Sequence, residues 1–184
     1  MGLILRKGAF GMQMENLRIV RAGVDDIVRL DEIAMAMKSA KSIGYFERAM
    51  EHQDAGERLV FIAEYEGQMA GYCMLAWNPK YAFYRAMGYP EIQDLNVLPD
   101  FRQRGIASAM IEKCEGLAQE KGLSHMGISV GLTASYGPAQ RLYFKLGYVP
   151  DGHGVTYDRQ PVAFGEFRPV DNDLCLMLVK DLQS

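Results

Sequence analysis

The sequence predicts an α/β domain, α+β in some schemes, with a central mixed β-sheet flanked by helices. Two features of the chain predict it. The β-prone runs at residues 58–65 and 68–77 are joined by Glu66-Gly67, which has the length and chemistry of a hairpin turn, so these strands are expected to be antiparallel. The runs at 91–97 and 125–130 enclose a helical pattern, and such a strand–helix–strand unit pairs its strands in parallel through a right-handed crossover.

The elements before the hairpin are expected to be one strand and two helices. Residues 17–21 form an apolar, strand-like run. Apolar residues between Val24 and Ala34 recur at helical spacing, which predicts a helix that starts near Asp25, and residues 45–50 predict a second, short helix. Both helices are expected to pack on the sheet.

The elements after the hairpin begin with an aromatic loop at residues 78–90. The most regular helical pattern follows the strand at 91–97. Its apolar side chains, from Ala107 to Ala118, recur three or four positions apart, and Lys121-Gly122 marks its end. A shorter helix over 138–146, a strand from residue 148, a glycine-rich loop and a last strand at 174–180 complete the chain.

Length and composition fit one globular domain. The chain has 184 residues, of which 49% are hydrophobic and 23% charged. We expect a single domain over residues 14–184, after a flexible extension at residues 1–13. The net charge of −3 argues against a surface built to bind nucleic acid. Because no apolar run approaches the ~20 residues that span a bilayer and no signal peptide is visible, we expect a cytoplasmic protein without a membrane partner.

The cysteines and histidines are scattered along the chain. Cys73, Cys114 and Cys175 form no C-x-x-C pair, and the three histidines form no H-x-x-x-H pair. We therefore expect no metal site, and we expect buried free thiols rather than nucleophiles.

The segment between the strand at 91–97 and the long helix combines Pro99, Arg102, Arg104 and Gly105. A helix N-terminus offers unpaired N–H groups and a partial positive charge, and a glycine there lets an anion approach the backbone. The segment lacks the G-x-x-x-x-G-K-[ST] and G-x-G-x-x-G motifs, which disfavours nucleoside triphosphates and dinucleotides. Charge alone leaves a turn with solvated arginines as the alternative.

The same segment resembles motif A of the GNAT superfamily of acyl-CoA-dependent N-acetyltransferases, [RQ]-x-x-G-x-[GA], which reads here Arg102-Gln103-Arg104-Gly105-Ile106-Ala107. Residues 139–148, AQRLYFKLGY, resemble the second family signature, A-x-x-L-Y-x-K-x-G-[FY]. Because both signatures occur in order within the expected alternation of strands and helices, the resemblance covers residues 17–180. It implies the GNAT fold, in which two parallel strands of the mixed sheet splay apart.

The resemblance implies that the chain binds acetyl-CoA. Backbone amides between Arg102 and Ser108 would hold the pyrophosphate, and Val97 with its neighbours would hold the pantetheine. Tyr143 matches the tyrosine that protonates the departing thiolate, a reasonable role for a phenol with a reference pKa of ~10. Many members carry Asn where this chain has Tyr136. The implied cofactor contacts are Asn96, Val97, Arg102, Gln103, Arg104, Gly105, Ile106, Ala107, Ser108, Tyr136, Ala139 and Tyr143.

An amine must be neutral to attack a thioester, so a base is expected near the acceptor. The candidates are Glu91 and Asp94. Glu91 lies six positions before Val97, the spacing of the catalytic glutamate in histone-type members, whereas Asp94 resembles an acidic position of small-molecule members. Strand alternation places the two on opposite faces, so without a bulge only one can face the substrate. The choice stays open, as does a role for either as a solvated carboxylate.

Acceptor binding is expected to fall to the first helices and to the loop before the strand at 91–97. The candidate aromatic residues are Tyr45, Phe46, Trp77, Tyr81 and Tyr84, with core packing as the alternative for each. Residues 151–173 are expected to cover the cleft or to form a dimer interface.

The favoured function is acetyl transfer from acetyl-CoA to the primary amine of a small molecule by direct attack. The alternatives are transfer to a protein N-terminus or lysine, and a CoA-binding sensor without turnover.

Overall fold

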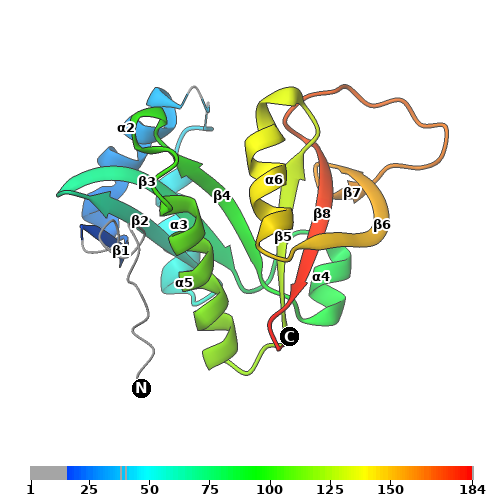
Figure 1. Ribbon diagram of the computed structural model, residues 1–184, viewed down its shortest axis with the longest axis horizontal. Helices are drawn as coiled ribbons and strands as arrows, with labels where there is room; N and C mark the ends of the chain where they lie inside the picture. The colour runs from blue at the N-terminus through cyan, green and yellow to red at the C-terminus, as the bar shows by residue number, and fades with distance from the viewer. Residues whose placement is uncertain (1–15, 38, 40, 184) are drawn as a thin grey trace, which may run out of the picture.

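The computed structural model describes residues 16–37, 39 and 41–183, so the extension expected at residues 1–13 lies outside the described residues (Figure 1). The strands are β1 (Leu17–Arg21), β2 (Arg58–Tyr65), β3 (Gln68–Ala76), β4 (Glu91–Val97), β5 (His125–Gly131), β6 (Val149–Tyr157), β7 (Gln160–Pro161) and β8 (Leu174–Asp181). The helices are α2 (Ile27–Ala36), α3 (Tyr45–Asp54), α4 (Ala82–Met87), α5 (Ile106–Glu120) and α6 (Gly137–Lys145), with 3-10 turns η1 (Val24–Asp26), η2 (Pro99–Phe101) and η3 (Ala134–Tyr136). No helix in this part of the chain is long and apolar enough to cross a membrane.

The strands form one mixed sheet in the order β1-β2-β3-β4-β5-β8-β6-β7. β2 and β3 pair antiparallel through a turn in which Glu66 and Gly67 have φ of +52° and +76°, the left-handed backbone that a tight hairpin requires. β4 and β5 pair in parallel through α5. Both observations that predicted the fold class are therefore confirmed.

Two elements differ from the sequence prediction. Residues 78–90 contain the six-residue helix α4 where a loop was expected. This helix is too short to show a periodicity, and it is held by aromatic packing of Tyr81 and Tyr84 against Met177 of β8. The helix expected near Asp25 begins as an α-helix only at Ile27, because residues 24–26 form a 3-10 turn.

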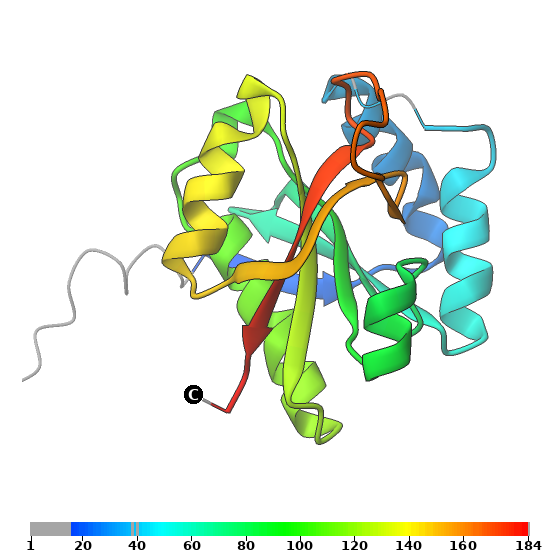
Figure 2. The same ribbon diagram turned by 90° about the vertical axis from the view of Figure 1, so that its right-hand side faces the viewer.

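Helices cover both faces of the sheet. Figure 2 shows α5 and α6 on one side, and α2, α3 and α4 on the other. Successive residues of β2 point to opposite faces of the sheet. Phe61 and Ala63 pack in the cluster that includes α5, whereas Val60 and Ile62 pack in the cluster that includes α2 and α3.

β4 changes its facing direction half-way along. Ile92 packs in the α5-side cluster, and so do Leu95 and Val97. In an unbroken strand, residues 92 and 95 would point to opposite faces. An extra residue must therefore lie between them.

That residue belongs to a β-bulge at Asp94. The pairing of β3 with β4 passes from Met74 opposite Gln93 to Tyr72 opposite Asn96, so two residues of β4 span the place of one residue of β3. Asp94 has a left-handed φ of +50°. Without a bulge, only one of the two candidate bases could face the substrate. The bulge brings Asp94 to the same face of the sheet as Glu91 and Gln93, so both carboxylates lie on one face.

The parallel pair β4–β5 separates just before the bulge. Its pairing covers only Glu91 opposite Gly127 and Ile92 opposite Ile128, and Figure 1 shows the two strands diverging beyond that point. From Gln93 onward, β4 is paired only with β3. The splayed strands implied by the family resemblance are present.

The bulge also depends on a close approach between β3 and β4. A Cβ atom at Gly71 would lie 2.4 Å from the backbone oxygen of Asn96, which cannot move without displacing the strand. We expect Gly71→Ala to lower the free energy of unfolding by about 1–3 kcal/mol, the usual cost of overpacking. Thermal or urea unfolding measures the loss.

Gly116→Ala is the matched control for this variant. Gly116 lies in α5, where an added Cβ meets nothing within 4 Å. Alanine there should raise stability by up to about 1 kcal/mol because it favours the helix. Equal effects of the two variants would contradict a tight contact at Gly71.

Candidate active site

The N-terminus of α5 presents a row of unpaired backbone N–H groups. Gln103 and Gly105 have φ of +60° and +78°, and no side chain caps the helix. Within the described chain, the backbone N–H groups of residues 103–108 donate no hydrogen bond, and the first that does is that of Ala109, to Gly105 O at 3.0 Å. Successive free N–H groups at a helix N-terminus bind an anion such as a phosphate.

Two arginines border these N–H groups without a carboxylate partner in the described residues. Arg102 donates from Nε to Val97 O at 3.2 Å, and Arg104 lies over the Tyr65 ring at 5.2 Å. Both guanidinium groups therefore keep their charge available to an anion. The residues present fit a phosphate-bearing cofactor here, with Asn96 and Val97 supplying unpaired strand edge beside it.

Tyr143 lies on α6, on the same side of the sheet as α5. Its ring is buried, and its hydroxyl forms no hydrogen bond with a described residue. Burial, and then the neighbouring Cys73 and Tyr136, raise the pKa of Tyr143. The phenol thus stays protonated across the physiological range.

Ala139 lies in the first turn of the same helix, and Tyr136 precedes the helix in η3. The Tyr136 hydroxyl donates to Asn172 Oδ1 at 3.2 Å, and its ring lies against Gly131, where a Cβ atom would approach to 2.5 Å. The departure from the family's asparagine is accommodated by a glycine on β5.

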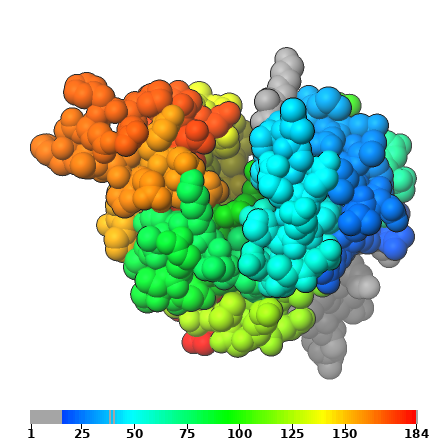
Figure 3. Space-filling view, turned by 180° about the vertical axis from the view of Figure 1, so that it is seen from behind, coloured from blue at the N-terminus to red at the C-terminus, as the bar shows by residue number. Residues whose placement is uncertain are grey.

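A cavity of about 360 Å³ lies on the opposite face of the sheet, beside Asp94. Figure 3 shows a hollow on this side of the molecule, between α3 in cyan, α4 in green and the β6–β7 arm in orange. The cavity is lined by Tyr45, His52, Glu57, Arg58, Ala76, Asn78, Pro79, Lys80, Gln93, Asp94 and Arg159.

Asp94 is held by two donors from the α3 side. Lys41 Nζ lies 2.9 Å from Asp94 Oδ2, and the Tyr45 hydroxyl donates to the same oxygen. Burial, and then the Asp94 carboxylate, raise the pKa of Tyr45, so that phenol remains a donor. Oδ1 of Asp94 accepts no hydrogen bond from the described residues.

Glu91 has a different environment. Its side chain is fully buried, and both oxygens are occupied: Arg159 Nε donates to Oε1 at 3.2 Å, and Gln93 Nε2 donates to Oε2 at 2.8 Å. Glu91 does not line the cavity, although its partner Arg159 does. Of the two candidate bases, Asp94 faces the space in which an acceptor could lie.

The model of the acetyltransferase (GNAT) family matches residues 27–148, which include the long helix, the splayed strands and the Tyr143 helix. The chain belongs to the GNAT family.

Relatives agree with this assignment. An uncharacterized N-acetyltransferase from Chlorobaculum tepidum is 32% identical over 99 residues, which are 54% of this chain and 57% of that protein, so the match spans little more than half of the relative's length.

Two solved structures share the GNAT fold. An acetyltransferase from Salmonella typhimurium that modifies the N-terminal serine of a ribosomal protein has a TM-score of 0.67 at 12% identity, covering 90% of this chain and 95% of that one. A GNAT acetyltransferase from Elizabethkingia anophelis with acetyl-CoA bound has a TM-score of 0.61 at 16% identity, covering 91% and 99%. At these identities the likeness concerns the fold.

Within the GNAT fold, the five aromatic residues expected at the acceptor site separate into four environments. Only Tyr45 lines the cavity beside Asp94. Phe46, on α3, is fully buried in the cluster that α2 and α3 form with the sheet. Tyr81, just before α4, and Tyr84, on α4, are buried against the sheet, and their hydroxyls donate to Asp151 Oδ2 at 2.8 Å and Leu178 O at 2.5 Å.

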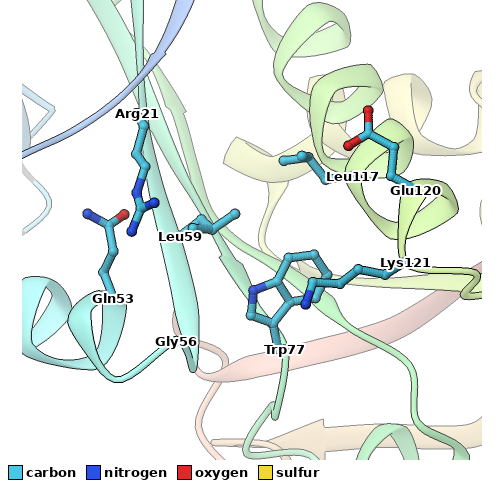
Figure 4. Close-up of a pocket in the computed structure, with 8 residues that line it drawn as sticks. All are labelled: Arg21, Gln53, Gly56, Leu59, Trp77, Leu117, Glu120 and Lys121. Carbon is cyan, nitrogen blue, oxygen red and sulfur yellow. The ribbon is translucent and has the colours of Figure 1, made fainter.

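Trp77 lies elsewhere. It packs in the α5-side cluster and lines a separate cavity with Leu117 and Lys121, whose Nζ is 4.6 Å from the ring centroid (Figure 4). Four of the five aromatic side chains are therefore placed for packing, away from Asp94.

Four cationic residues of the site were not singled out in the sequence. Lys41 contacts Asp94, and Arg58, Lys80 and Arg159 line the cavity. Arg159 lies 68 positions from its partner Glu91, so no local pattern links them. Only the fold, which brings the β6–β7 turn over β4, reveals the pair.

The buried pair of Glu91 and Arg159 makes a testable contribution to stability. We expect Arg159→Met to lower the free energy of unfolding by about 2 kcal/mol, because it leaves the Glu91 carboxylate buried without its countercharge. The loss should be smaller than for a wholly buried pair, since 27% of the Arg159 side chain is exposed.

The double variant Glu91→Gln with Arg159→Met should recover most of the loss in urea unfolding, because the buried charge is gone. Equal losses in the single and double variants would show that Arg159 stabilises by packing instead.

Proposed function

We propose that this chain transfers the acetyl group of acetyl-CoA to the primary amine of a small molecule by direct attack. Acetyl-CoA, when bound, supplies a thioester with an electrophilic carbonyl carbon and a thiolate leaving group. The observation that carries the proposal is the convergence on β4: the free N–H groups before α5, the unpaired strand edge and the Asp94 cavity all adjoin it.

The cofactor would be held by the backbone. The N–H groups of residues 103–108 would bind the pyrophosphate, with the unpaired Arg102 and Arg104 adding positive charge. The edge of β4 at Asn96 and Val97 would pair with an amide-bearing chain as a strand does.

Asp94 is proposed as the general base. Asp94 lines the cavity and its Oδ1 accepts no hydrogen bond from the described residues, while Lys41 and Tyr45 hold Oδ2 and fix the carboxylate's orientation. A negative carboxylate first attracts the acceptor as an ammonium ion and then accepts its proton, directly or through water. Glu91 is proposed as a positioning residue that holds Arg159 over the cavity.

Tyr143 is proposed as the acid for the leaving thiolate. Its hydroxyl donates no hydrogen bond to a described residue. Because burial raises the pKa of Tyr143, the hydroxyl keeps its proton across the physiological pH range. The phenol lies on the α5 side of the sheet, where the cofactor's phosphates would bind. Proton donor and cofactor would thus share one face.

The size of the Asp94 cavity supports a small acceptor over a protein one. At about 360 Å³ it has the volume of a small-molecule site, and residues from α3, β2, β3, β4 and the β6–β7 turn wall it. The Salmonella relative's acceptor, a protein N-terminus, is the alternative to be tested. The cytoplasmic location and a homodimer through residues 151–173 stay predictions.

The first test measures acetyl-CoA binding by calorimetry and thiol release with a panel of amines and peptides. We expect binding and turnover with one class of small amine. Turnover with peptides alone would overturn the small-molecule proposal, binding without any turnover would favour a CoA-binding sensor, and no binding would contradict the cofactor site.

Asp94→Asn should lower kcat/KM at least about 100-fold, the usual contribution of a general base, without changing the affinity for acetyl-CoA. Glu91→Gln is the matched comparison, since it removes the other carboxylate on this face of β4. It should act mainly on stability. A larger loss of kcat with Glu91→Gln than with Asp94→Asn would reverse the assignment.

Tyr143→Phe should lower kcat about 100-fold because the thiolate loses its proton donor. The Kd for acetyl-CoA should be nearly unchanged, since the ring stays in place. Tyr89→Phe is the control: its hydroxyl makes no hydrogen bond with a described residue, and it lies away from α6. Unchanged turnover of the Tyr143 variant at all pH values would refute the acid role.

A further inference from the structure

The charges that line the Asp94 cavity are of both signs, and most are already paired. His52 Nδ1 lies 2.6 Å from Glu57 Oε2, and Lys80 Nζ lies 2.6 Å from Asp158 Oδ2. Arg159 is bound to the buried Glu91. These groups satisfy one another without a ligand.

Arg58 is the exception. It is half-buried at the start of β2 and lines the cavity, yet no carboxylate of the described residues lies within ion-pair distance of it. Its recorded hydrogen bond is from Nη1 to the thioether sulfur of Met74 at 3.3 Å, a weak acceptor. A guanidinium in this position has most of its five N–H donors free for an anion.

Arg58 also lies near enough to the reacting end of the cavity to act on the same ligand as Asp94. Its positive charge, with that of Arg159, lowers the pKa of Tyr45, against the larger effects of burial and Asp94, and Tyr45 is hydrogen-bonded to Asp94. In the sheet, Arg58 stands opposite Ala76, which stands opposite Glu91, three positions before Asp94. This register puts the Cα atoms of Arg58 and Asp94 roughly 14 Å apart. The length of the arginine side chain covers about half of that distance.

We propose that the acceptor is an amino acid, whose carboxylate is bound by Arg58 while its amine lies at Asp94. Asp94 offers an ammonium group the oxygen Oδ1, which Lys41 and Tyr45 leave without a hydrogen bond, and Arg58 provides the planar donor pair that matches a carboxylate. A plain amine or polyamine would leave the Arg58 guanidinium unpaired beside a bound cation. The inference rests on the proposed function and specifies its substrate class.

The test compares amino acids with the amines that lack only the carboxylate: lysine with cadaverine, tyrosine with tyramine, histidine with histamine, and alanine with ethylamine. Thiol release with acetyl-CoA gives kcat/KM for each. In the accepted pair, the amino acid should exceed its amine by about tenfold to a hundredfold, the value of a charge-assisted hydrogen-bonded contact.

Arg58→Gln should abolish this preference by raising KM for the amino acid, while kcat/KM for the amine rises because a nearby positive charge is removed. Arg58→Lys should recover part of it, because a point charge replaces the bidentate fork. Arg18→Gln is the control, an exposed arginine on β1 outside the cavity. Equal use of amine and amino acid, or an equal loss for both in Arg58→Gln, would overturn the proposal.

Direct binding separates this inference from the proposed function. Binding of the same amino acids to the protein with CoA present is followed by calorimetry. If no amine or amino acid is acetylated but an amino acid binds and Arg58→Gln abolishes binding, the site stands and acetyl transfer is refuted. If acetyl-CoA supports turnover of amines only, or no amino acid binds, the carboxylate site is refuted.

Discussion

The bulge at Asp94 is the constraint on which the site depends. One extra residue in β4 returns Leu95 and Val97 to the α5-side core after it has placed Asp94 on the opposite face. Without it, the strand would point Asp94 into the α5-side core, where an unpaired carboxylate is costly. The same irregularity lies within the part of β4 that is not paired with β5, so it positions a carboxylate beside the unpaired strand edge.

Buried electrostatics then assemble the cavity wall. Glu91 is fully buried, and burial of a carboxylate is tolerated here because Arg159 and Gln93 supply donors to both oxygens. Since Arg159 belongs to the turn between β6 and β7, the pair ties a distant hairpin to β4. Tyr81, through Asp151, ties the start of α4 to the same hairpin. The cavity is thus closed by contacts between segments far apart in sequence.

Much of the fold was predictable because short stretches of sequence determine its strands, turns and helices. The hairpin turn at Glu66-Gly67, the strand at 91–97 and the helix after Gly105 each follow from spacing and turn chemistry. The bulge did not, because an aspartate adopts a left-handed φ more often than most residues but does not by itself predict one within a strand. The packing role of Tyr84 also depends on the fold. Its ring lies against Gly127, so close that a Cβ atom on Gly127 would be 2.3 Å from the nearest ring atom. The roles of Arg58 and Arg159 could not be predicted from the sequence, because they depend on the fold bringing β2 and the β6–β7 turn to one cavity.

The two proposed proton-transfer groups lie on opposite faces of the sheet. Tyr143 belongs to the α5-side layer with the free N–H groups, whereas Asp94 faces the α3-side cavity. An intact β4–β5 ladder would separate them with hydrogen-bonded backbone. Since the pairing stops at Ile92, the proposed donor would enter from one face and the proposed acceptor from the other, and they would meet where the strands diverge. In this arrangement the proposed base would lie next to the amine and the proposed acid next to the thiolate, so neither would neutralise the other.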